Sequence, residues 1–225
     1  MIFLPEWFDS ATLAAAWLIL LLLLTAAVRP ALKVLRQYSS ACLLAVMIIV
    51  CAWCLSASPD DGQLAGISYH LLAVNLVALM VGIPAALWLT ALLLLPYLVF
   101  FGAGWTVYPA NALALLLPAL LVNALSRYIV RRLPANIFIF IFVNGFLAAA
   151  AGMILTGLVL VSILDWRDAF GAAVLWQTAF PVFILIAWAE AFLSGITTAI
   201  FVALRPQWIH TFDDNLYLKS TKHIW

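Results

Sequence analysis

The sequence predicts an all-α integral membrane protein of about seven transmembrane helices, and two observations support this prediction. The first is composition, since 68% of the 225 residues are hydrophobic and only 8% are charged. Mean hydropathy is +1.20. Soluble chains carry about 25% charged residues, so this chain has too little polar surface to cover a water-soluble particle. The second is that the apolar residues form helix-length runs, not the alternating segments of about ten residues that build an outer-membrane barrel.

Seven apolar runs define the expected spans. They cover about Ser10–Val28, Ser39–Ala57, Ile67–Val81, Gly82-Ile83-Pro84 to Phe101, Tyr108–Tyr128, Asn136–Ile163 and Phe170–Leu204. The last two exceed the roughly 20 residues that cross a bilayer, which predicts tilt or a kink, with Pro181 as the kink in the seventh. The first run is not a cleavable signal peptide, because Glu6 and Asp9 precede it where such a signal is positively charged.

The chain shows no repeats or linkers. We expect one polytopic membrane domain over residues 1–205 and a short cytoplasmic tail over residues 206–225. The tail is the only sizeable polar segment, and it is either a docking segment or simply solvated.

The charged residues predict the orientation in the membrane. Nine of the ten Lys and Arg residues fall on one side of a seven-span chain, all except Arg167. They follow the first, fifth and seventh runs: Arg29, Lys33, Arg36; Arg127, Arg131, Arg132; and Arg205, Lys219, Lys222. The other side receives the acidic residues Glu6, Asp9, Asp60, Asp61, Asp165 and Asp168. Basic loops face the cytoplasm, so we expect the amino terminus outside, the carboxyl terminus inside, and a multi-pass protein of the cytoplasmic (inner) cell membrane. A net charge of +1 excludes a basic surface for nucleic acid.

Three soft side chains lie along the second run. The spacing of Met47, Cys51 and Cys54 places them on one helical face, where they would suit Cu(I) or form a redox pair. The other interpretation is ordinary apolar filling of a membrane helix.

Two ionisable residues within the runs are functional candidates, since charges inside a bilayer are costly. His70 lies just inside the third run and Glu190 midway along the seventh, each without a sequence-adjacent counter-ion. Neutral imidazole is a common metal ligand and a buried carboxylate can orient it. Alternatively, each makes an interhelical hydrogen bond. Side-chain amides predict a polar interior: Asn75, Asn111, Asn123, Asn144 and Gln177.

Four segments, in order, resemble the energy-coupling-factor-type cobalt/nickel permease (CbiM-like) family. They are Gly66-Ile-Ser-Tyr-His-Leu-Leu-Ala73, Leu79-Met-Val-Gly-Ile-Pro-Ala86, Tyr108-Pro-Ala-Asn111, and Ala189-Glu-Ala-Phe-Leu-Ser-Gly-Ile196 followed by Leu204-Arg-Pro206. The resemblance implies a substrate-binding membrane component for cobalt or nickel that works with a transmembrane coupling subunit and ATPase subunits. It also implies a metal held by the terminal amine, a histidine at the second position, and the histidine that corresponds to His70. The chain has no phosphate-binding loop, so we expect no bound nucleotide.

The chain departs from that family pattern at two positions. It begins Met1-Ile2, without the second-position histidine, and Ala73 stands where the motif has glycine. Three outcomes stay open: Met1, His70 and the cysteines favour copper; the ligand is not a metal; or translation starts elsewhere. Because residues 1–8 are largely apolar, we expect them to pack into the bundle or the interface.

Two function classes follow. The first is a permease component for transition-metal uptake, with His70 and Met1 as ligands and with Glu190, Asn111 and Asn75 around them. The second is a membrane protein for copper or redox handling that delivers metal to another membrane enzyme through Met47, Cys51 and Cys54. We do not predict an enzyme, because no nucleophile–base pair or catalytic metal centre has a recognisable spacing.

Overall fold

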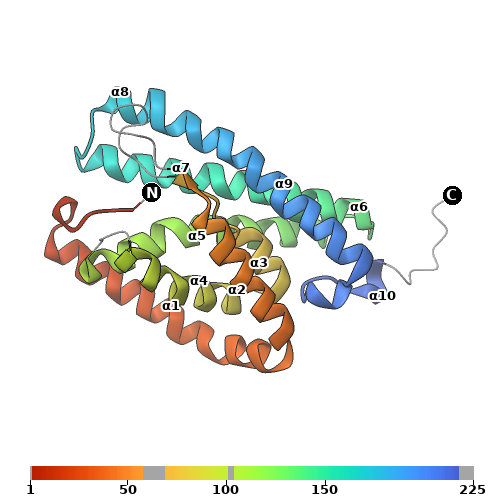
Figure 1. The fold of residues 1–225 in the computed structure, drawn as a ribbon. Coiled ribbons are helices and arrows are strands. Elements are labelled where there is room, and N and C mark those ends of the chain that lie inside the picture. Colours follow the sequence, from red (N-terminus) through yellow and green to blue (C-terminus); the bar gives the residue numbers. More distant parts are fainter. Residues whose placement is uncertain (1, 58–68, 101–103, 218–225) are drawn as a thin grey trace.

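The computed structural model describes residues 2–57, 69–100 and 104–217, and it confirms an all-α membrane protein (Figure 1). Within these residues, five helices are long and apolar enough to cross a membrane, at Ser10–Gln37, Ile83–Phe100, Trp105–Val130, Ile137–Trp166 and Ala172–Leu204. The one β-ladder of this part of the chain is antiparallel and joins the two-residue strands β1 (Ser56–Ala57) and β2 (Tyr69–His70). The total of seven spans and their orientation stay predictions.

The helices follow the apolar runs in order. Their bounds are α1 Ser10–Gln37, α2 Ser39–Cys54, α3 Val74–Val81, α4 Ile83–Phe100, α5 Tyr108–Val130, α6 Ile137–Ile139, α7 Ala148–Trp166, α8 Ala172–Val174, α9 Phe180–Leu204 and α10 Asp214–Tyr217. Two π-helical segments, η3 (Phe140–Leu147) and η4 (Leu175–Ala179), join α6 to α7 and α8 to α9. Single 3-10 turns lie at Pro5–Trp7 (η1), Trp105–Val107 (η2) and Pro206–Trp208 (η5). Pro181, the expected kink, is the second residue of α9, just after η4.

The third run differs from its prediction. We expected one helix over Ile67–Val81, but the helix α3 has eight residues, about 12 Å of rise, which is too short to cross a bilayer on its own. Ala73 adopts a left-handed conformation at φ 56° immediately before α3, and Gly82 ends it at φ 79°. His70 consequently lies in β2 ahead of the helix and not inside it, which corrects its predicted position. Every residue of α3 is buried, so this short helix lies in the centre of the bundle.

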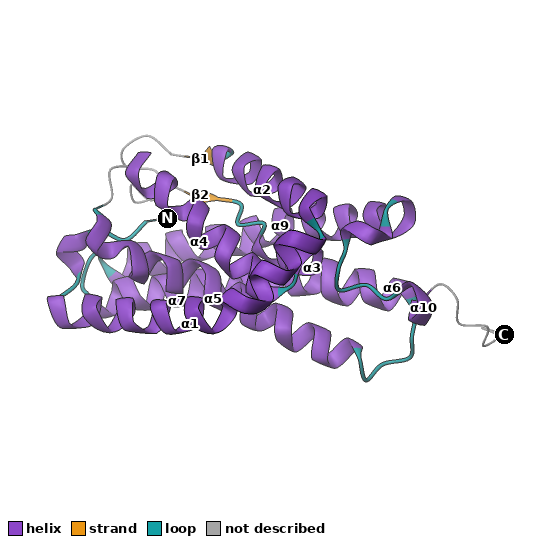
Figure 2. Cartoon of the chain, turned by 90° about the horizontal axis from the view of Figure 1, so that it is seen from below, coloured by secondary structure: helices purple, strands orange, loops and turns teal. Residues whose placement is uncertain are grey.

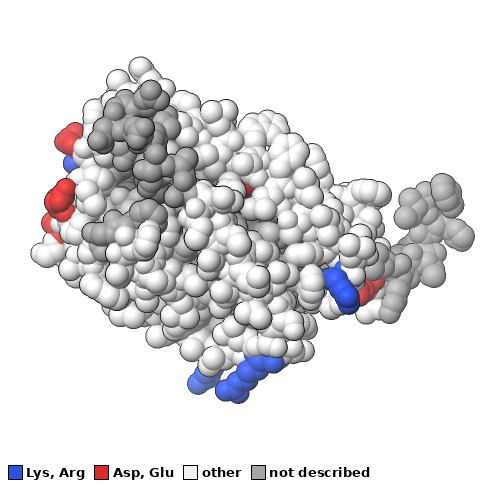
Figure 3. Space-filling model, viewed as in Figure 1, with Lys and Arg blue, Asp and Glu red and all other residues white. Residues whose placement is uncertain are grey.

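On the face seen in Figure 3, most acidic side chains lie at the left edge and the basic ones lie at the lower and right edges, and the surface between them is almost free of charged side chains, as expected of a membrane protein. At the acidic end, Asp9 caps α1 by accepting hydrogen bonds from Thr12, and it pairs with Arg167 at 2.6 Å. These hydrogen bonds from Thr12 and Arg167 hold the pKa of Asp9 well below its usual value. The predicted loop acids Asp60 and Asp61 lie outside the described residues.

The chain turns back after α9 and covers the carboxyl-terminal end of α3. His210 donates its backbone N–H to Met80 O at 2.9 Å, and the Thr211 hydroxyl donates to Leu79 O at 2.8 Å. Ile209 and Phe212 are buried beside Leu79. The described part of the expected tail, residues 206–217, is therefore docked on its own bundle at the end where α10 lies (Figure 1).

Candidate functional site

His70 lies in β2, which pairs with β1 beside the end of α2 (Figure 2), and it is buried among aromatic side chains. Its side chain is 4% exposed. The rings of Trp53 from α2 and Tyr97 from α4 pack against the imidazole, with centroid distances of 5.9 and 5.1 Å. We had not predicted Trp53 or Tyr97, because aromatic residues in apolar runs give no signal that distinguishes a pocket wall from lipid contact.

The hydrogen bonding of His70 determines which ring nitrogen is free. Nδ1 lies 3.0 Å from Leu71 O. A carbonyl oxygen only accepts hydrogen bonds, so Nδ1 carries the proton and Nε2 carries the lone pair. Nε2 is buried, and no described residue donates to it. A histidine that donates one N–H to a backbone carbonyl while its other nitrogen keeps a lone pair without a hydrogen-bond partner has the arrangement of a metal ligand.

Glu190 acts on the loop that follows His70. Its Oε1 accepts the backbone N–H groups of Leu72 and of Ala73, the latter at 2.9 Å. The indole of Trp53 donates to Leu72 O at 3.1 Å. A carboxylate at this place also faces the amino-terminal end of α3, where the helix dipole favours negative charge. Glu190 therefore holds the backbone after His70, and its hydrogen bonds go to that backbone and not to the imidazole.

Asn111 anchors the amino-terminal segment. Phe3 is 1% exposed, and its N–H donates to Asn111 Oδ1 at 2.7 Å. The Asn111 amide in turn donates to Phe3 O at 3.2 Å. Ile2, Trp7 and Phe8 pack against the same core, which confirms for residues 2–8 that the segment enters the bundle. Met1, the predicted second ligand, lies outside the described residues.

Asn75 lies deeper in the bundle, on α3. Its amide donates to Asn144 O at 2.9 Å and to the Ser194 hydroxyl at 3.0 Å. Asn123 donates to its Oδ1 at 2.9 Å. The predicted polar interior therefore exists for the four asparagines, which are all buried, and the structure adds Ser194 to it. The prediction was wrong for Gln177, which lies in η4 and is exposed.

The alternative soft-metal residues face outward. Met47 is 56% exposed, and Cys51 and Cys54 are both exposed free thiols, whereas Cys42 is buried. In the described part of the chain no group of three or more His, Cys, Asp or Glu side chains comes together. Cys54 lines an open apolar hollow of about 660 Å³. Trp53 and Tyr97, the two aromatic residues that pack against His70, line the same hollow.

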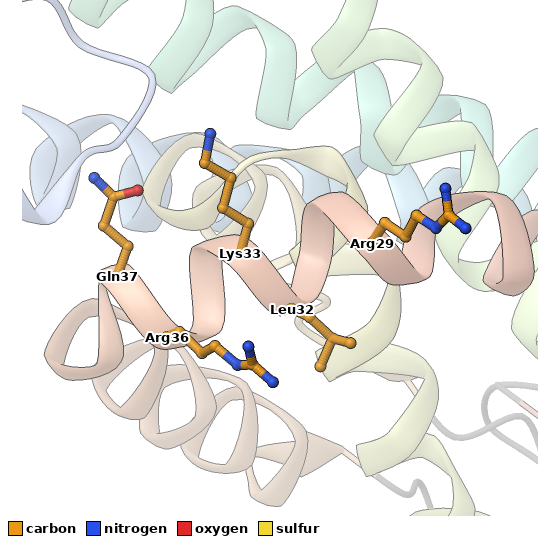
Figure 4. Close-up of a pocket in the computed structure, with 5 residues that line it drawn as sticks. All are labelled: Arg29, Leu32, Lys33, Arg36 and Gln37. Carbon is orange, nitrogen blue, oxygen red and sulfur yellow. The ribbon is translucent and has the colours of Figure 1, made fainter.

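A second hollow, of about 490 Å³, is basic (Figure 4). Arg29, Lys33 and Arg36 line it, together with Leu32 and Gln37, all on the last turns of α1. Positive charges repel a metal ion, so this hollow is not a metal site. A cationic surface of this kind suits anionic lipid headgroups.

Two comparisons with known proteins indicate that this chain is a component of a transport system. The sequence model of one family, described as the cobalt uptake substrate-specific transmembrane region, matches residues 5–208. The fold is similar to the crystal structure of a truncated transition-metal transporter, with a TM-score of 0.75 and 16% identity over 90% of this chain and 98% of that chain. No curated protein matches the chain significantly.

Proposed function

Because this chain belongs to the family of cobalt-uptake substrate-specific transmembrane proteins, we propose that it is the metal-capturing subunit of an energy-coupling-factor-type uptake system. Membership of this family supports a multi-pass membrane component of metal uptake. The proposal adds the place of capture, the ions captured and the partners.

One observation carries the proposal: the buried Nε2 lone pair of His70, which no described residue engages. Burying a polar atom without a partner is costly, so it needs an explanation. Nδ1 is committed to Leu71 O, and Glu190 and Trp53 hold the following backbone, so the imidazole is oriented before any ion arrives. Such preorganisation favours a ligand role.

The second proposed ligand is the amine of Met1. Phe3 is buried and bonded to Asn111, and two residues of chain span at most about 8 Å, so this part of the core is within reach of the proposed amine ligand. Nitrogen ligands favour divalent transition-metal ions, and we assign Co²⁺ or Ni²⁺ to the site. The absence of a histidine at Ile2 predicts weaker binding than a site with two imidazoles.

The proposed partners are a transmembrane coupling subunit and ATPase subunits in the cytoplasmic membrane. The chain has no phosphate-binding loop of its own, so energy for uptake must come from another subunit. The basic hollow on α1 lies on the side that the positive-inside rule assigns to the cytoplasm, where anionic lipids surround the protein.

The test is equilibrium dialysis of the full chain in detergent against Co²⁺, Ni²⁺ and Cu(I). His70→Ala should weaken Co²⁺ or Ni²⁺ binding by tenfold or more. His210→Ala is the matched control, because His210 is the other histidine in the described residues. It lies at the carboxyl-terminal end of α3, whereas His70 precedes the amino-terminal end. Equal affinity in wild type and His70→Ala, with both proteins folded, would contradict the proposal.

A further inference from the structure

One basic residue lies apart from all the others. Nine of the ten Lys and Arg residues fall on the predicted cytoplasmic side, and Arg167 alone falls on the predicted outer side, among the acidic residues. A positive charge there opposes the attraction of a metal cation to that acidic surface. The proposed metal site does not use Arg167, so its position needs another explanation.

A Schellman turn fixes Arg167 at the carboxyl-terminal end of α7. Asp168, the next residue, has a left-handed backbone at φ 51°. Its N–H bonds Asp165 O at 3.1 Å, and the N–H of Ala169 bonds Leu164 O at 3.0 Å. These two hydrogen bonds are the pair that defines a Schellman turn. The helix therefore ends at a defined residue, and the side chain of Arg167 starts from a fixed backbone position.

The guanidinium group of Arg167 binds the amino-terminal part of the chain. It donates to Asp9 Oδ1 at 2.6 Å and to the Thr12 hydroxyl at 3.2 Å. Its central carbon lies 5.1 Å from the ring centroid of Phe8 and 4.9 Å from that of Trp166. Among the residues that the structure describes, Asp9 and Arg167 form the one ion pair.

This ion pair differs from a solvated surface contact, which stabilises a protein little. The side chain of Arg167 is only 19% exposed, and its two aromatic neighbours add cation–π attraction. Trp7 packs on Phe170, beyond the Schellman turn, with ring centroids 5.5 Å apart. These contacts fasten residues 7–9 to the loop between α7 and α8, which lies at the same end of the molecule (Figure 1).

The same segment is anchored again nearer its start. Phe3 is buried and exchanges two hydrogen bonds with Asn111, of 2.7 and 3.2 Å. A Cβ atom added to Gly104 would lie 3.2 Å from Cγ of Pro5, so these two residues pack closely. Residues 3–9 are therefore held by α5, by the residue before η2 and by the α7–α8 loop.

Fastening this segment matters because its start carries the proposed second ligand. A free chain end loses conformational entropy when it orders around an ion, whereas an end fixed by folding has already lost that freedom. With Ile2 in place of a histidine, the proposed site has one imidazole, so its affinity depends more strongly on the Met1 amine.

We propose that Arg167 is a positioning residue for metal capture. It fixes residues 7–9 against the α7–α8 loop and so holds the amino terminus where the amine of Met1 binds the ion. This inference rests on the proposed function, because that amine is its second ligand.

A double-mutant cycle on Co²⁺ affinity tests whether Arg167 acts through the amine. The four proteins are wild type, Arg167→Gln, a chain extended by Gly-Ser ahead of Met1, and the extended chain with Arg167→Gln. Each is measured by equilibrium dialysis in detergent. The extension moves the amine by up to about 7 Å. Arg132→Gln is the matched control, because Arg132 also packs on an aromatic ring, that of Tyr128, but on the predicted cytoplasmic side.

We expect Arg167→Gln to weaken Co²⁺ binding about tenfold or more in the chain of native length. In the extended chain, which has already lost the amine, the same change should cost less than about twofold. Arg132→Gln should leave the affinity unchanged, and Arg167→Lys, which keeps the charge, should recover part of the loss. Asp9→Asn removes the same ion pair but keeps an acceptor for the Thr12 N–H, so it gives a second measurement if Arg167→Gln does not fold.

Equal losses from Arg167→Gln in both chains would overturn the inference, because the residue would then act on general stability and not through the amine. An extension that leaves the affinity unchanged would overturn it as well. His70→Ala in the chain of native length distinguishes these failures from failure of the proposed function. Binding that depends on His70 beside either result contradicts the role of Arg167, whereas binding that ignores His70 contradicts the proposed function itself.

Discussion

The His70 loop and the outward face of α2 both carry residue types that can bind metals, but only the loop is enclosed by several elements of the fold. Around His70, four elements converge: α2 and α4 supply the aromatic walls, α9 supplies Glu190, and β2 carries the imidazole. Met47, Cys51 and Cys54 share one face of a single helix, and that face is exposed. Spacing on one helix brings ligands into register, but a metal site also requires a second element to complete and enclose it.

The largest expected effect is at the carboxylate that holds the loop. Glu190→Ala leaves the buried N–H groups of Leu72 and Ala73 without an acceptor, at about 1–3 kcal/mol each. We expect a clear fall in the thermal unfolding midpoint in detergent and loss of Co²⁺ binding. Glu190→Gln keeps an acceptor oxygen and should restore much of both; an Ala variant as stable and as tight-binding as wild type would show that the loop does not depend on Glu190.

Packing behind the loop gives the next effect. A Cβ atom on Gly157 would lie 2.9 Å from Cδ1 of Phe183 and closer still to other atoms of that side chain. Phe183 packs on Tyr69, the neighbour of His70, with ring centroids 5.3 Å apart. Gly157→Ala should therefore destabilise the protein by about 1–3 kcal/mol and weaken metal binding.

Gly171→Ala is the control for that change, because an added Cβ meets nothing within 4 Å. Similar unfolding midpoints for the two variants would mean that Phe183 does not transmit strain to the loop.

The strained backbone beside His70 predicts a stabilising substitution. Ala73 has φ 56°, a conformation that glycine adopts without penalty, so Ala73→Gly should raise stability by about 1 kcal/mol. Ala78→Gly, inside α3, should lower it by about the same amount. The opposite signs are read from paired thermal melts, and a loss of stability at both positions would argue against the left-handed turn.

The smallest effect is expected on α2. Changing both Cys51 and Cys54 to Ser should leave the bound Co²⁺ or Ni²⁺ unchanged, because both thiols are exposed and lie outside the His70 pocket. Metal analysis of the purified double variant checks this. A loss of copper confined to this variant would instead support the copper-delivery function.

Composition and run length predicted the membrane class, and the runs that became α1, α2 and α5 begin where we expected, at Ser10, Ser39 and Tyr108. The predicted helix over the third run was too long, because buried loop residues are as apolar as helical ones. The sequence also gives no sign that the backbone of Ala73 is left-handed. The cost of placing ionisable groups in a bilayer singled out His70 and Glu190, and the family resemblance pointed to the same two residues. Their linkage joins Leu72 to a residue 118 positions away, so no local pattern reveals it.

X-ray absorption at the cobalt or nickel edge of the metal-loaded full chain tests most directly whether the metal binds at the His70 loop or at the thiols of α2. The spectrum reports which elements coordinate the metal. The account predicts a nitrogen and oxygen shell with imidazole scattering that disappears in His70→Ala. A sulfur shell at about 2.3 Å, lost in the Cys51 and Cys54 double variant and kept in His70→Ala, would contradict it.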